Sequence, residues 1–378
     1  MLYRIELRPL MPYFFGGEVT FPFRGSGERS PYLIRSEPVP PQSTLFGTLR
    51  YVLLEMTGQI REGTITRDDG LIGPATFSFD PEQKQTFGRI EEISPLLIQK
   101  YEGTAGNPAT FFNTPLNHVV LNGETVRVIR MVQPEYALIC DGRDKPFLPG
   151  IEDENGKEIA LTDKHYSVRG YLSSEGKYLG DSEIFSCDMR TGINARRNLR
   201  DVMDDQDAYF KKEYCSLQPG YFFTFWARLL DGPEQIPERY DTVVSMGQMK
   251  SPFSWSMTKC ETDAEITAVL PPVPDALKCS SEDPTVCFFA LSDCFFPDGL
   301  PGDPIWYMLD RKPFHTLRTV PEAGSYYQRF EADRTEQRVM IRRGSVLYYR
   351  GQANEEPLVN GKDKYKAIGM NHFIRIGG

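Results

Sequence analysis

The sequence predicts an α+β fold in which strands predominate. Three observations predict it: an opening segment that alternates apolar and charged residues, one amphipathic helix near residue 50, and many short strand-like segments separated by glycine, proline and polar turns. Strict alternation is typical of a half-buried strand, whereas steps of three and four residues are typical of a helix. The chain has 378 residues, which is long enough for two ordinary domains.

The first predicted element is a strand at residues 3–8. Tyr3, Ile5 and Leu7 alternate with charged residues, so we expect one face of this strand to be buried. Residues 12–42 then hold too many prolines and glycines for one regular element. We expect a long ordered loop or a bent hairpin there, and long loops within a domain are often functional.

A helix is expected to begin near Gln42, in the stretch PQSTLFGTLRYVLLE (41–55). Its apolar residues recur at helical spacing and should form one buried face; they are Leu45, Leu49, Val52, Leu53 and Met56. We expect Ser43 or Thr44 to cap the first amides with a hydroxyl. Gly47 is unusual, because glycine inside a helix costs about 1 kcal/mol relative to alanine. A strand packed closely against it would explain the glycine, and so would an anion near the helix start.

Beyond Gly58 the pattern predicts mostly strands. The expected segments are 87–101, 118–123, 126–133, 182–194, 220–230, 264–270, 286–296, 338–343, 345–350 and 367–376. The pair 338–343 and 345–350 should form a hairpin through Gly344, and 195–214 is interpreted as a polar turn. We place a domain boundary near residue 180, which gives two domains, 1–180 and 181–378.

Several classes of protein lack support in the sequence. No apolar run approaches the roughly 18 residues of a membrane span, so we expect no membrane contact and a cytoplasmic location. The seven cysteines form no C-x-x-C pair, which favours reduced thiols over a disulfide framework or a zinc site. No phosphate-binding loop, zinc-protease or serine-hydrolase motif occurs, so we expect neither a cofactor nor a metal.

The charge distribution is more informative than the net charge. A net charge of −9 argues against indiscriminate nucleic-acid binding. Both ends of the chain are nevertheless locally basic, and the basic residues of 1–50 are all arginine, which suits bidentate phosphate contacts. Solvated surface charge explains any single arginine equally well.

The densest polar cluster is RTGINARRNLR (190–200). It holds Arg190, Asn194, Arg196, Arg197 and Arg200. Arginines this close repel one another unless an anion is near. The aspartates that follow them could balance the charge, or a sugar-phosphate backbone could do so, with Tyr209 or Phe210 available to stack on bases.

Several segments together resemble the RAMP superfamily of CRISPR proteins. They are YRIELRPLMPYFFG, PQSTLFGTLR (41–50), MRTGI (189–193) and KYKAIGMNHFI near the end of the chain. Within the superfamily, the chain resembles the third subunit of type III-B Cmr effector complexes, which holds the 5′ handle of the CRISPR RNA. The helix start and the R-x-G-I strand are the specific parts of this resemblance.

The resemblance implies tandem ferredoxin-like (RRM-like) domains with long loop and β-hairpin insertions. It also implies a non-catalytic subunit whose partners are the CRISPR RNA, the large palm-domain subunit and the RAMP backbone subunits. The expected RNA-binding residues are Arg35, Gln42, Ser43, Thr44, Arg50, Arg190, Asn194, Arg196, Arg197 and Lys364. Of the superfamily's glycine-rich loop before the last strand, Gly369, Gly377 and Gly378 remain here, and the lysines Lys362, Lys364 and Lys366 are expected to take its place.

The sequence is also compatible with two other functions. One is a RAMP endoribonuclease that processes precursor CRISPR RNA, which is disfavoured because no histidine precedes His118. The other is a β-rich enzyme that acts on a small acidic substrate, which would require a concave pocket near Arg190.

Overall fold

The structure is a computed structural model that describes most of the chain. The described residues are 1–20, 32–61, 64–65, 68–74, 77–101, 108–121, 125–128, 130–132, 148–152, 158–160, 170–193, 209–247, 250–261, 275–277, 285–314, 317–321, 330–334, 338–350, 358 and 363–377. The chain divides into two units, each made from interleaved segments. The first unit comprises Met1–Thr114, Arg169–Lys278 and Gly361–Met370, and the second comprises Pro115–Val168, Cys279–Asn360 and Asn371–Gly378.

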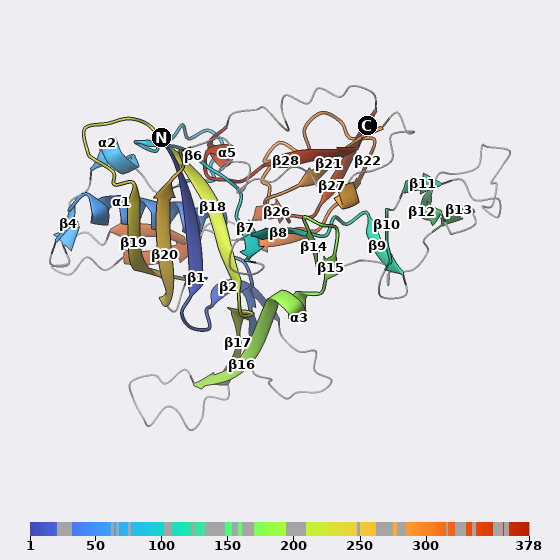
Figure 1. Ribbon diagram of the computed structural model, residues 1–378, viewed down its shortest axis with the longest axis horizontal. Coiled ribbons are helices and arrows are strands. Elements are labelled where there is room, and N and C mark those ends of the chain that lie inside the picture. The colour runs from blue at the N-terminus through green and yellow to red at the C-terminus, as the bar shows by residue number, and fades with distance from the viewer. Residues whose placement is uncertain are drawn as a thin grey trace. The chain divides into compact units, whose positions relative to one another are not determined.

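The first unit contains an antiparallel sheet of nine strands, called here the main sheet (Figure 1). In spatial order its strands are β15 (Tyr178–Leu179), β14 (Tyr171–Ser173), β8 (Ala109–Asn113), β7 (Leu97–Lys100), β18 (Tyr221–Leu229), β1 (Leu2–Pro9), β20 (Ser251–Lys259) and β19 (Arg239–Met246). The ninth strand, β6 (Ile90–Ile93), also pairs with β18. The sheet therefore joins strands that precede and follow residue 180. The predicted division into 1–180 and 181–378 stays a prediction.

The first strand, β1, lies between β18 and β20. Ile5 is opposite Phe225 on one side and Met257 on the other. Tyr3, Ile5 and Leu7 are completely buried, as their alternation predicted. The predicted strand at the start of the chain is confirmed, and the core of this unit is built on it.

The longest helix among the described residues, α1 (Gln42–Met56), confirms the predicted helix. Leu45, Leu49, Val52 and Leu53 are fully buried. The expected hydroxyl cap is wrong. The helix is capped by Pro41, whose carbonyl oxygen accepts from the amides of Thr44 at 2.9 Å and Leu45 at 3.1 Å. Because the helix begins at Gln42, two residues earlier than a Ser43 cap requires, Ser43 and Thr44 already lie inside the first turn.

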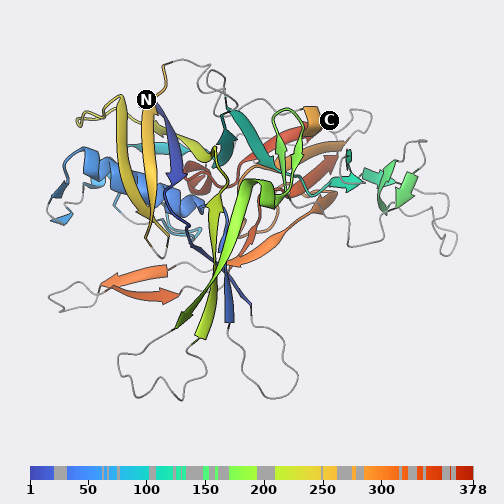
Figure 2. The same ribbon diagram turned by 60° about the horizontal axis from the view of Figure 1, so that its bottom comes forward.

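A second sheet of the first unit, called here the hairpin sheet, has the order β16–β17–β3–β2. Its strands are β16 (Phe185–Ile193), β17 (Tyr209–Leu217), β3 (Tyr32–Glu37) and β2 (Phe15–Thr20). β2 and β3 are antiparallel, so the expected bent hairpin is confirmed. β17 corrects the interpretation of 195–214 as a polar turn, because its residues from Tyr209 onward form a strand. The paired strands run side by side in Figure 2.

Shorter elements complete the first unit. They are α2 (Asp69–Ile72), α3 (Asp181–Ile184), α5 (Lys364–Ala367), the 3-10 turn Asp275–Leu277, and the two-residue strands β4 (Ile60–Arg61) and β5 (Thr64–Ile65). The helix α1 contacts both α2 and β19.

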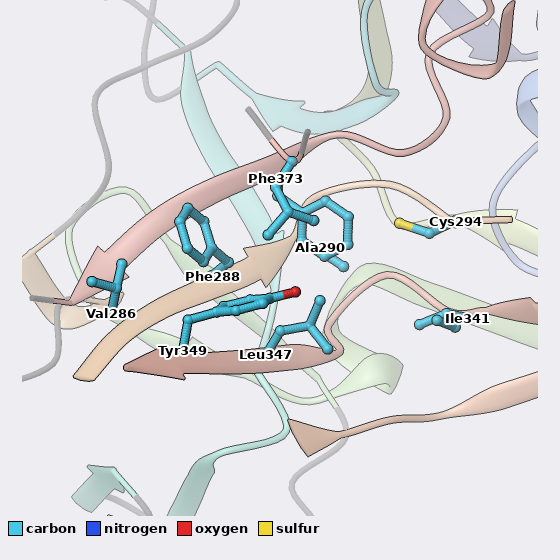
Figure 3. Packing of buried hydrophobic residues seen from close by; sticks show 9 residues of the cluster. Val286, Phe288, Ala290, Cys294, Ile341, Leu347, Tyr349 and Phe373 are labelled. Atoms are coloured by element: carbon cyan, nitrogen blue, oxygen red, sulfur yellow. The ribbon is translucent and has the colours of Figure 1, made fainter. Parts of the chain in front are cut away.

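The second unit contains a four-stranded antiparallel sheet. Its order is β22 (Trp306–Met308), β27 (Val346–Arg350), β21 (Thr285–Ala290) and β28 (Phe373–Gly377). Its core gathers Val286, Phe288, Ala290, Cys294, Ile341, Leu347, Tyr349, Leu358 and Phe373 (Figure 3). The rings of Phe288 and Tyr349 meet edge to face, with centroids 5.7 Å apart.

Smaller pairings in the second unit join β23 (Arg311–Phe314) to β26 (Arg338–Ile341), β24 (Leu317–Pro321) to β25 (Phe330–Arg334), and β9 (His118–Leu121) to β10 (Thr125–Val128). β12 (Leu148–Glu152) lies between β11 (Arg130–Val132) and β13 (Glu158–Ala160). The predicted hairpin of 338–343 with 345–350 is wrong, because β26 pairs with β23 while β27 pairs with β21 and β22. The predicted strand 264–270 lies outside the described residues.

Within the described part of the chain, no helix is long and apolar enough to cross a membrane. No cluster of histidine, cysteine and carboxylate side chains suited to a metal ion occurs among the same residues.

Candidate nucleic-acid interface

The start of α1 is anchored from inside the first unit by Gln42. Its Nε2 donates to the carbonyl oxygens of Ser94 at 3.0 Å and Ile368 at 3.2 Å, and its Oε1 accepts from the amide of Leu96 at 3.1 Å. The side chain is only 3% exposed. One amide group thus holds together the helix start, the connection from β6 to β7, and the turn after α5.

Gly369 makes this close packing of the turn after α5 possible. Its φ is +80°, and a Cβ at this position would overlap Gln42 Nε2 and the Ser94 carbonyl oxygen. Any other residue would therefore be strained and would push the turn away from the helix. Gly369 therefore packs directly against the start of α1.

The outer surface of the same helix is open. Ser43 and Gly47 are exposed, and Tyr51 is 42% exposed. A Cβ at Gly47 would have no atom within 4 Å. Among the residues that the structure describes, packing of a neighbouring strand therefore does not explain Gly47.

Arg50 differs from its predicted role as an RNA contact. It falls on the buried side of α1, where its Nε donates to the carbonyl oxygen of Ile72 at 2.9 Å and its Nη2 to that of Gly73 at 3.1 Å. The guanidinium thus satisfies carbonyls at the end of α2. The side chains of Gln42 and Arg50 both position α1, and neither faces solvent.

Lys364 is also engaged within the chain. It lies at the start of α5, where its Nζ donates to the carbonyl oxygens of Asp80 and Gln83. Asp363 caps the same helix by accepting from the amide of Lys366 at 2.7 Å. The structure therefore shows Lys364 fastening the segment around residue 80, and its predicted RNA contact stays a prediction.

Two basic side chains lie opposite each other on the hairpin sheet. Arg190 on β16 is directly opposite Lys212 on β17. The Arg190 guanidinium lies 4.8 Å from the centre of the Tyr214 ring, and the Lys212 ammonium lies 5.1 Å from the centre of the Phe14 ring. We call these four residues the basic strip. Its rings also touch, with the centroids of Phe14 and Tyr214 5.8 Å apart.

A nearby carboxylate neutralises this strip in part. Asp188 Oδ2 lies 2.9 Å from Arg190 Nε, with the side chains 63% and 50% exposed. An ion pair this exposed contributes little, because water and salt screen it. The Arg190 guanidinium therefore remains available to a stronger anion.

The opposite face of the hairpin sheet carries both basic and acidic residues, since Glu37 and Glu213 share it with Arg35 and Lys211. Lys211 on β17 is exposed and pairs with Leu33 on β3. Because side chains two residues apart share a face, the exposed Arg35 lies on the same face as Leu33 and Lys211. Among the residues that the structure describes, Arg35 has no ion-pair partner.

The predicted site residues thus fall into separate groups. Ser43 and Thr44 lie at the accessible start of α1, and Arg35 and Arg190 lie on the hairpin sheet. Asn194, Arg196 and Arg197 lie outside the described residues. Sequence reasoning missed Lys211 and Lys212 as site residues, although the alternation in YFKKEY (209–214) is a strand signal that could have found them.

A strand-rich protein that presents cations over aromatic rings on paired strands, beside an anchored helix start, has the features of a protein that binds an anionic polymer. The comparison with protein families then gives the particular family. Residues 5–376 match the model described as CRISPR-associated protein (Cas_Cmr3), and the chain belongs to this family. The resemblance seen in the sequence is therefore confirmed.

Two solved structures are similar over most of the chain. A chain in the cryo-EM structure of the Type III-B Cmr-beta bound to cognate target RNA has 14% sequence identity and a TM-score of 0.47, with 99% of this chain and 96% of that chain covered. A chain in the structure of the same assembly bound to cognate target RNA and AMPPnP, state 1, has 14% identity and a TM-score of 0.40, with 91% and 86% covered. No curated protein matches the chain.

Proposed function

We propose that the chain is a non-catalytic subunit of a type III-B CRISPR ribonucleoprotein. It binds the 5′ handle of the CRISPR RNA and docks the large palm-domain subunit to the RAMP backbone subunits for RNA-guided antiviral interference. Membership of the Cas_Cmr3 family supports the part of this proposal that places the chain in a CRISPR complex. The basic strip is the observation that carries RNA binding.

The strip suits a sugar-phosphate backbone for a physical reason. Two like charges directly opposite each other on neighbouring strands destabilise a sheet, and Arg190 and Lys212 have this arrangement. The rings of Tyr214 and Phe14 relieve part of the repulsion by cation–π attraction. A phosphate placed near both cations would be attracted by both of them.

The start of α1 is the second part of the proposed RNA site. Ser43 offers an exposed hydroxyl, and Gly47 leaves room beside it. The first amides of a helix favour an anion, since they point outward and the helix dipole is positive there. Gln42 and Arg50 contribute by holding this helix end in place.

The strand orders support two ferredoxin-like repeats. In such a βαββαβ unit the strands lie in the spatial order four, one, three, two, and all neighbours are antiparallel. The main sheet contains β20–β1–β18–β7, with α1 following β1 in the chain. The sheet of the second unit reads β28–β21–β27–β22 from its other edge. We therefore propose that one repeat ends with β20 and the next begins with β21, and that the other strands are insertions.

The position of His118 supports the non-catalytic role over the endoribonuclease. Its side chain is completely buried, and its Nδ1 lies 2.8 Å from Asn117 Oδ1. Asn117 in turn donates to the Tyr348 hydroxyl at 2.6 Å. A general acid or base must reach its substrate, and His118 is enclosed in this polar network. His165 and His315 lie outside the described residues.

The position of Arg190 likewise favours RNA over a small acidic substrate. β16 is the outer strand of the hairpin sheet, and the Arg190 side chain is half exposed on it. A small-molecule enzyme would need a concave site that buries most of its ligand. An exposed strip on paired strands suits an extended polymer better.

Docking to the other subunits rests on family membership and charge. The net charge of −9 leaves an acidic surface beyond the basic strip, and basic faces of partner subunits would complement it. The expected partners are those of the assembly: the CRISPR RNA, the large palm-domain subunit and the RAMP backbone subunits.

The proposal is tested by purifying the tagged chain from its native cell, sequencing the bound RNA and identifying bound proteins by mass spectrometry. We expect one class of short RNA with a common 5′ end, together with several RAMP subunits. Recovery of the chain without RNA would contradict the proposal. Cleavage of a precursor RNA by the purified chain would instead favour the endoribonuclease.

A further inference from the structure

Cys187 and Cys215 form a thiol pair near the base of the hairpin formed by β16 and β17. They are opposite each other in the register of the two strands, and their sulfur atoms lie 3.8 Å apart. Cys187 is exposed, whereas Cys215 is only 1% exposed. A reagent in solution can therefore reach one thiol, and that thiol is adjacent to the other.

The backbone hydrogen bonds show which kind of strand pair this is. The amide of Cys215 donates to the Tyr13 carbonyl oxygen at 3.0 Å, and the Tyr13 amide donates to the Cys215 carbonyl oxygen at 2.8 Å. In an antiparallel strand the N–H and C=O of one residue point to the same side. Both groups of Cys215 therefore point away from β16, and Cys187 and Cys215 form a non-hydrogen-bonded pair.

A non-hydrogen-bonded pair has the Cα spacing that a disulfide needs. Its Cα atoms lie about 4.5 Å apart, closer than in a hydrogen-bonded pair. Disulfides form when the Cα atoms are roughly 4.4 to 6.8 Å apart and the Cβ atoms face each other. The two cysteines can be bridged by side-chain rotation, with little movement of the strands.

We propose that Cys187 and Cys215 form a reversible disulfide by exchange with a low-molecular-weight disulfide such as oxidised glutathione. The thiolate of Cys187 attacks one glutathione sulfur, breaks its disulfide and releases one reduced glutathione. The thiolate of Cys215 then attacks Cys187 Sγ and releases the second. The two cysteines are oxidised, the glutathione disulfide is reduced, and the two thiol protons end on the released glutathione molecules.

The local environment sets the speed of this exchange. Burial raises the pKa of the Cys187 thiol, and the carboxylates of Glu213 and Asp181 add to the rise. Burial raises the pKa of Cys215 to about 12, and the adjacent Cys187 adds to the effect. The thiolate is the nucleophile, so exchange is slow at neutral pH and accelerates as the pH rises. The neighbouring Tyr13 phenol, whose own pKa burial raises, stays uncharged through this range.

The disulfide would affect the hairpin formed by β16 and β17. Arg190, Lys211 and Lys212 all lie between the two cysteines in the chain. A disulfide at this position ties β16 to β17 below the basic strip. It prevents the strands from separating there, whatever the hairpin binds.

The test treats the full chain with oxidised glutathione at pH 8.5 and analyses its peptides by mass spectrometry without reduction. We expect a cross-linked peptide that contains Cys187 and Cys215, the loss of two thiols per chain, and full reversal by dithiothreitol. Cys187→Ser should abolish the cross-link. Cys260→Ser, which changes a cysteine outside the pair, should leave it unchanged.

Two results would overturn the proposal. One is a stable glutathione adduct on Cys187 with no cross-link, which would show that Cys215 does not reach it. The other is no loss of thiol at these two positions. Because Cys187 is exposed, its serine variant should stay folded, and its circular dichroism spectrum should match that of the Cys260→Ser control.

A second measurement follows the hairpin itself. Amide hydrogen exchange of β16 and β17 should slow by about tenfold or more in the oxidised chain, because separation of the strands at this point is blocked. Equal exchange in the oxidised and reduced chains would contradict the claim that the bond closes the hairpin. Exchange in the main sheet should not change.

Discussion

Arg190 and Lys212 are direct cross-strand partners, so the hairpin sheet carries two neighbouring cations on one face. Each cation lies over an aromatic ring, and Asp188 is the ion-pair partner shown for Arg190. A protein gains no stability from placing like charges opposite each other. The arrangement therefore favours a role in binding.

We predict that changing Arg190→Gln together with Lys212→Gln weakens binding of the CRISPR RNA handle by the reconstituted complex. Each lost phosphate contact should lower the slope of log affinity against log salt by about 0.7, so the double variant should lower it by about 1.4. Fluorescence anisotropy across a salt series measures this slope. The thermal midpoint of the chain should change little, because the variant removes the repulsion between the cations together with the exposed ion pair and the cation–π contacts that offset it.

The matched control removes two arginines elsewhere in the first unit. Arg228 pairs with Glu92 at 2.9 Å and Arg239 pairs with Asp241 at 2.8 Å, both on exposed parts of the main sheet. Arg228→Gln with Arg239→Gln should leave the salt slope unchanged. Equal slopes for the two double variants would rule out the basic strip as a phosphate contact.

We also expect Arg196→Ala together with Arg197→Ala to weaken handle binding, because both belong to the dense arginine cluster of the sequence. Loss of two phosphate contacts should again lower the salt slope by about 1.4. The same anisotropy series measures it. If the variant binds RNA as tightly as the parent does, these arginines form ion pairs with the acidic residues that follow them and do not contact the RNA.

Gln42 should be important for stability, although it was predicted as an RNA contact. Gln42→Ala leaves the Ser94 and Ile368 carbonyl oxygens and the Leu96 amide without their buried partner. Such a loss should lower the free energy of unfolding by about 3 kcal/mol, which urea titration measures. Ser43→Ala changes the exposed neighbouring residue and should cost less than about 0.5 kcal/mol. Similar values for the two variants would contradict the anchoring role.

A substitution at Gly47 should change the stability of α1 and the binding of RNA in opposite directions. Because a Cβ there would touch nothing in the chain, Gly47→Ala should raise the free energy of unfolding by about 1 kcal/mol. The added methyl group should at the same time weaken handle binding, since it occupies the space beside the helix start. Urea titration and anisotropy measure the two effects. A variant that is more stable and binds equally well would show that RNA does not approach Gly47.

Asp293 should make the stability of the second unit depend on pH. Burial would by itself raise the pKa of this carboxyl, but Lys312, with its ammonium at 2.7 Å, and Arg343 outweigh burial and hold the pKa well below its usual range. The folded state therefore binds a proton less readily than the unfolded chain. The resulting stability is present above the unfolded pKa of about 3.9 and is lost as the pH falls below it.

Asp293→Asn tests this dependence. At pH 7 it should lower the free energy of unfolding by about 3 kcal/mol, because two buried cations lose their counter-charge. Near pH 3 the difference between parent and variant should shrink, since the parent carboxyl begins to take up a proton as it unfolds. Urea titration at both pH values measures the difference. A constant difference would show that the charge of Asp293 is not responsible.

The local pattern of the sequence determined the elements near the start of the chain. Alternation predicted β1, helical spacing predicted the buried face of α1, and the prolines and glycines of 12–42 predicted a long ordered loop or a bent hairpin, of which the structure has the hairpin. Such periodicities act within a single segment, because they depend on which side of one strand or helix is buried. The motifs PQSTLFGTLR and MRTGI, which are also local, indicated the family to which the chain belongs.

Tertiary structure decided how the elements pair and which polar side chains remain accessible. β26 and β27 follow each other in the chain but take different partners, because strand pairing depends on which edges are open elsewhere in the fold. Gln42 and Arg50 are polar and lie in α1, yet both side chains are buried. Each donates hydrogen bonds to backbone carbonyl oxygens that lie far from it in the sequence. Lys212 became a site residue only when β17 placed it opposite Arg190, since a contact between segments far apart in sequence leaves no local pattern in either one.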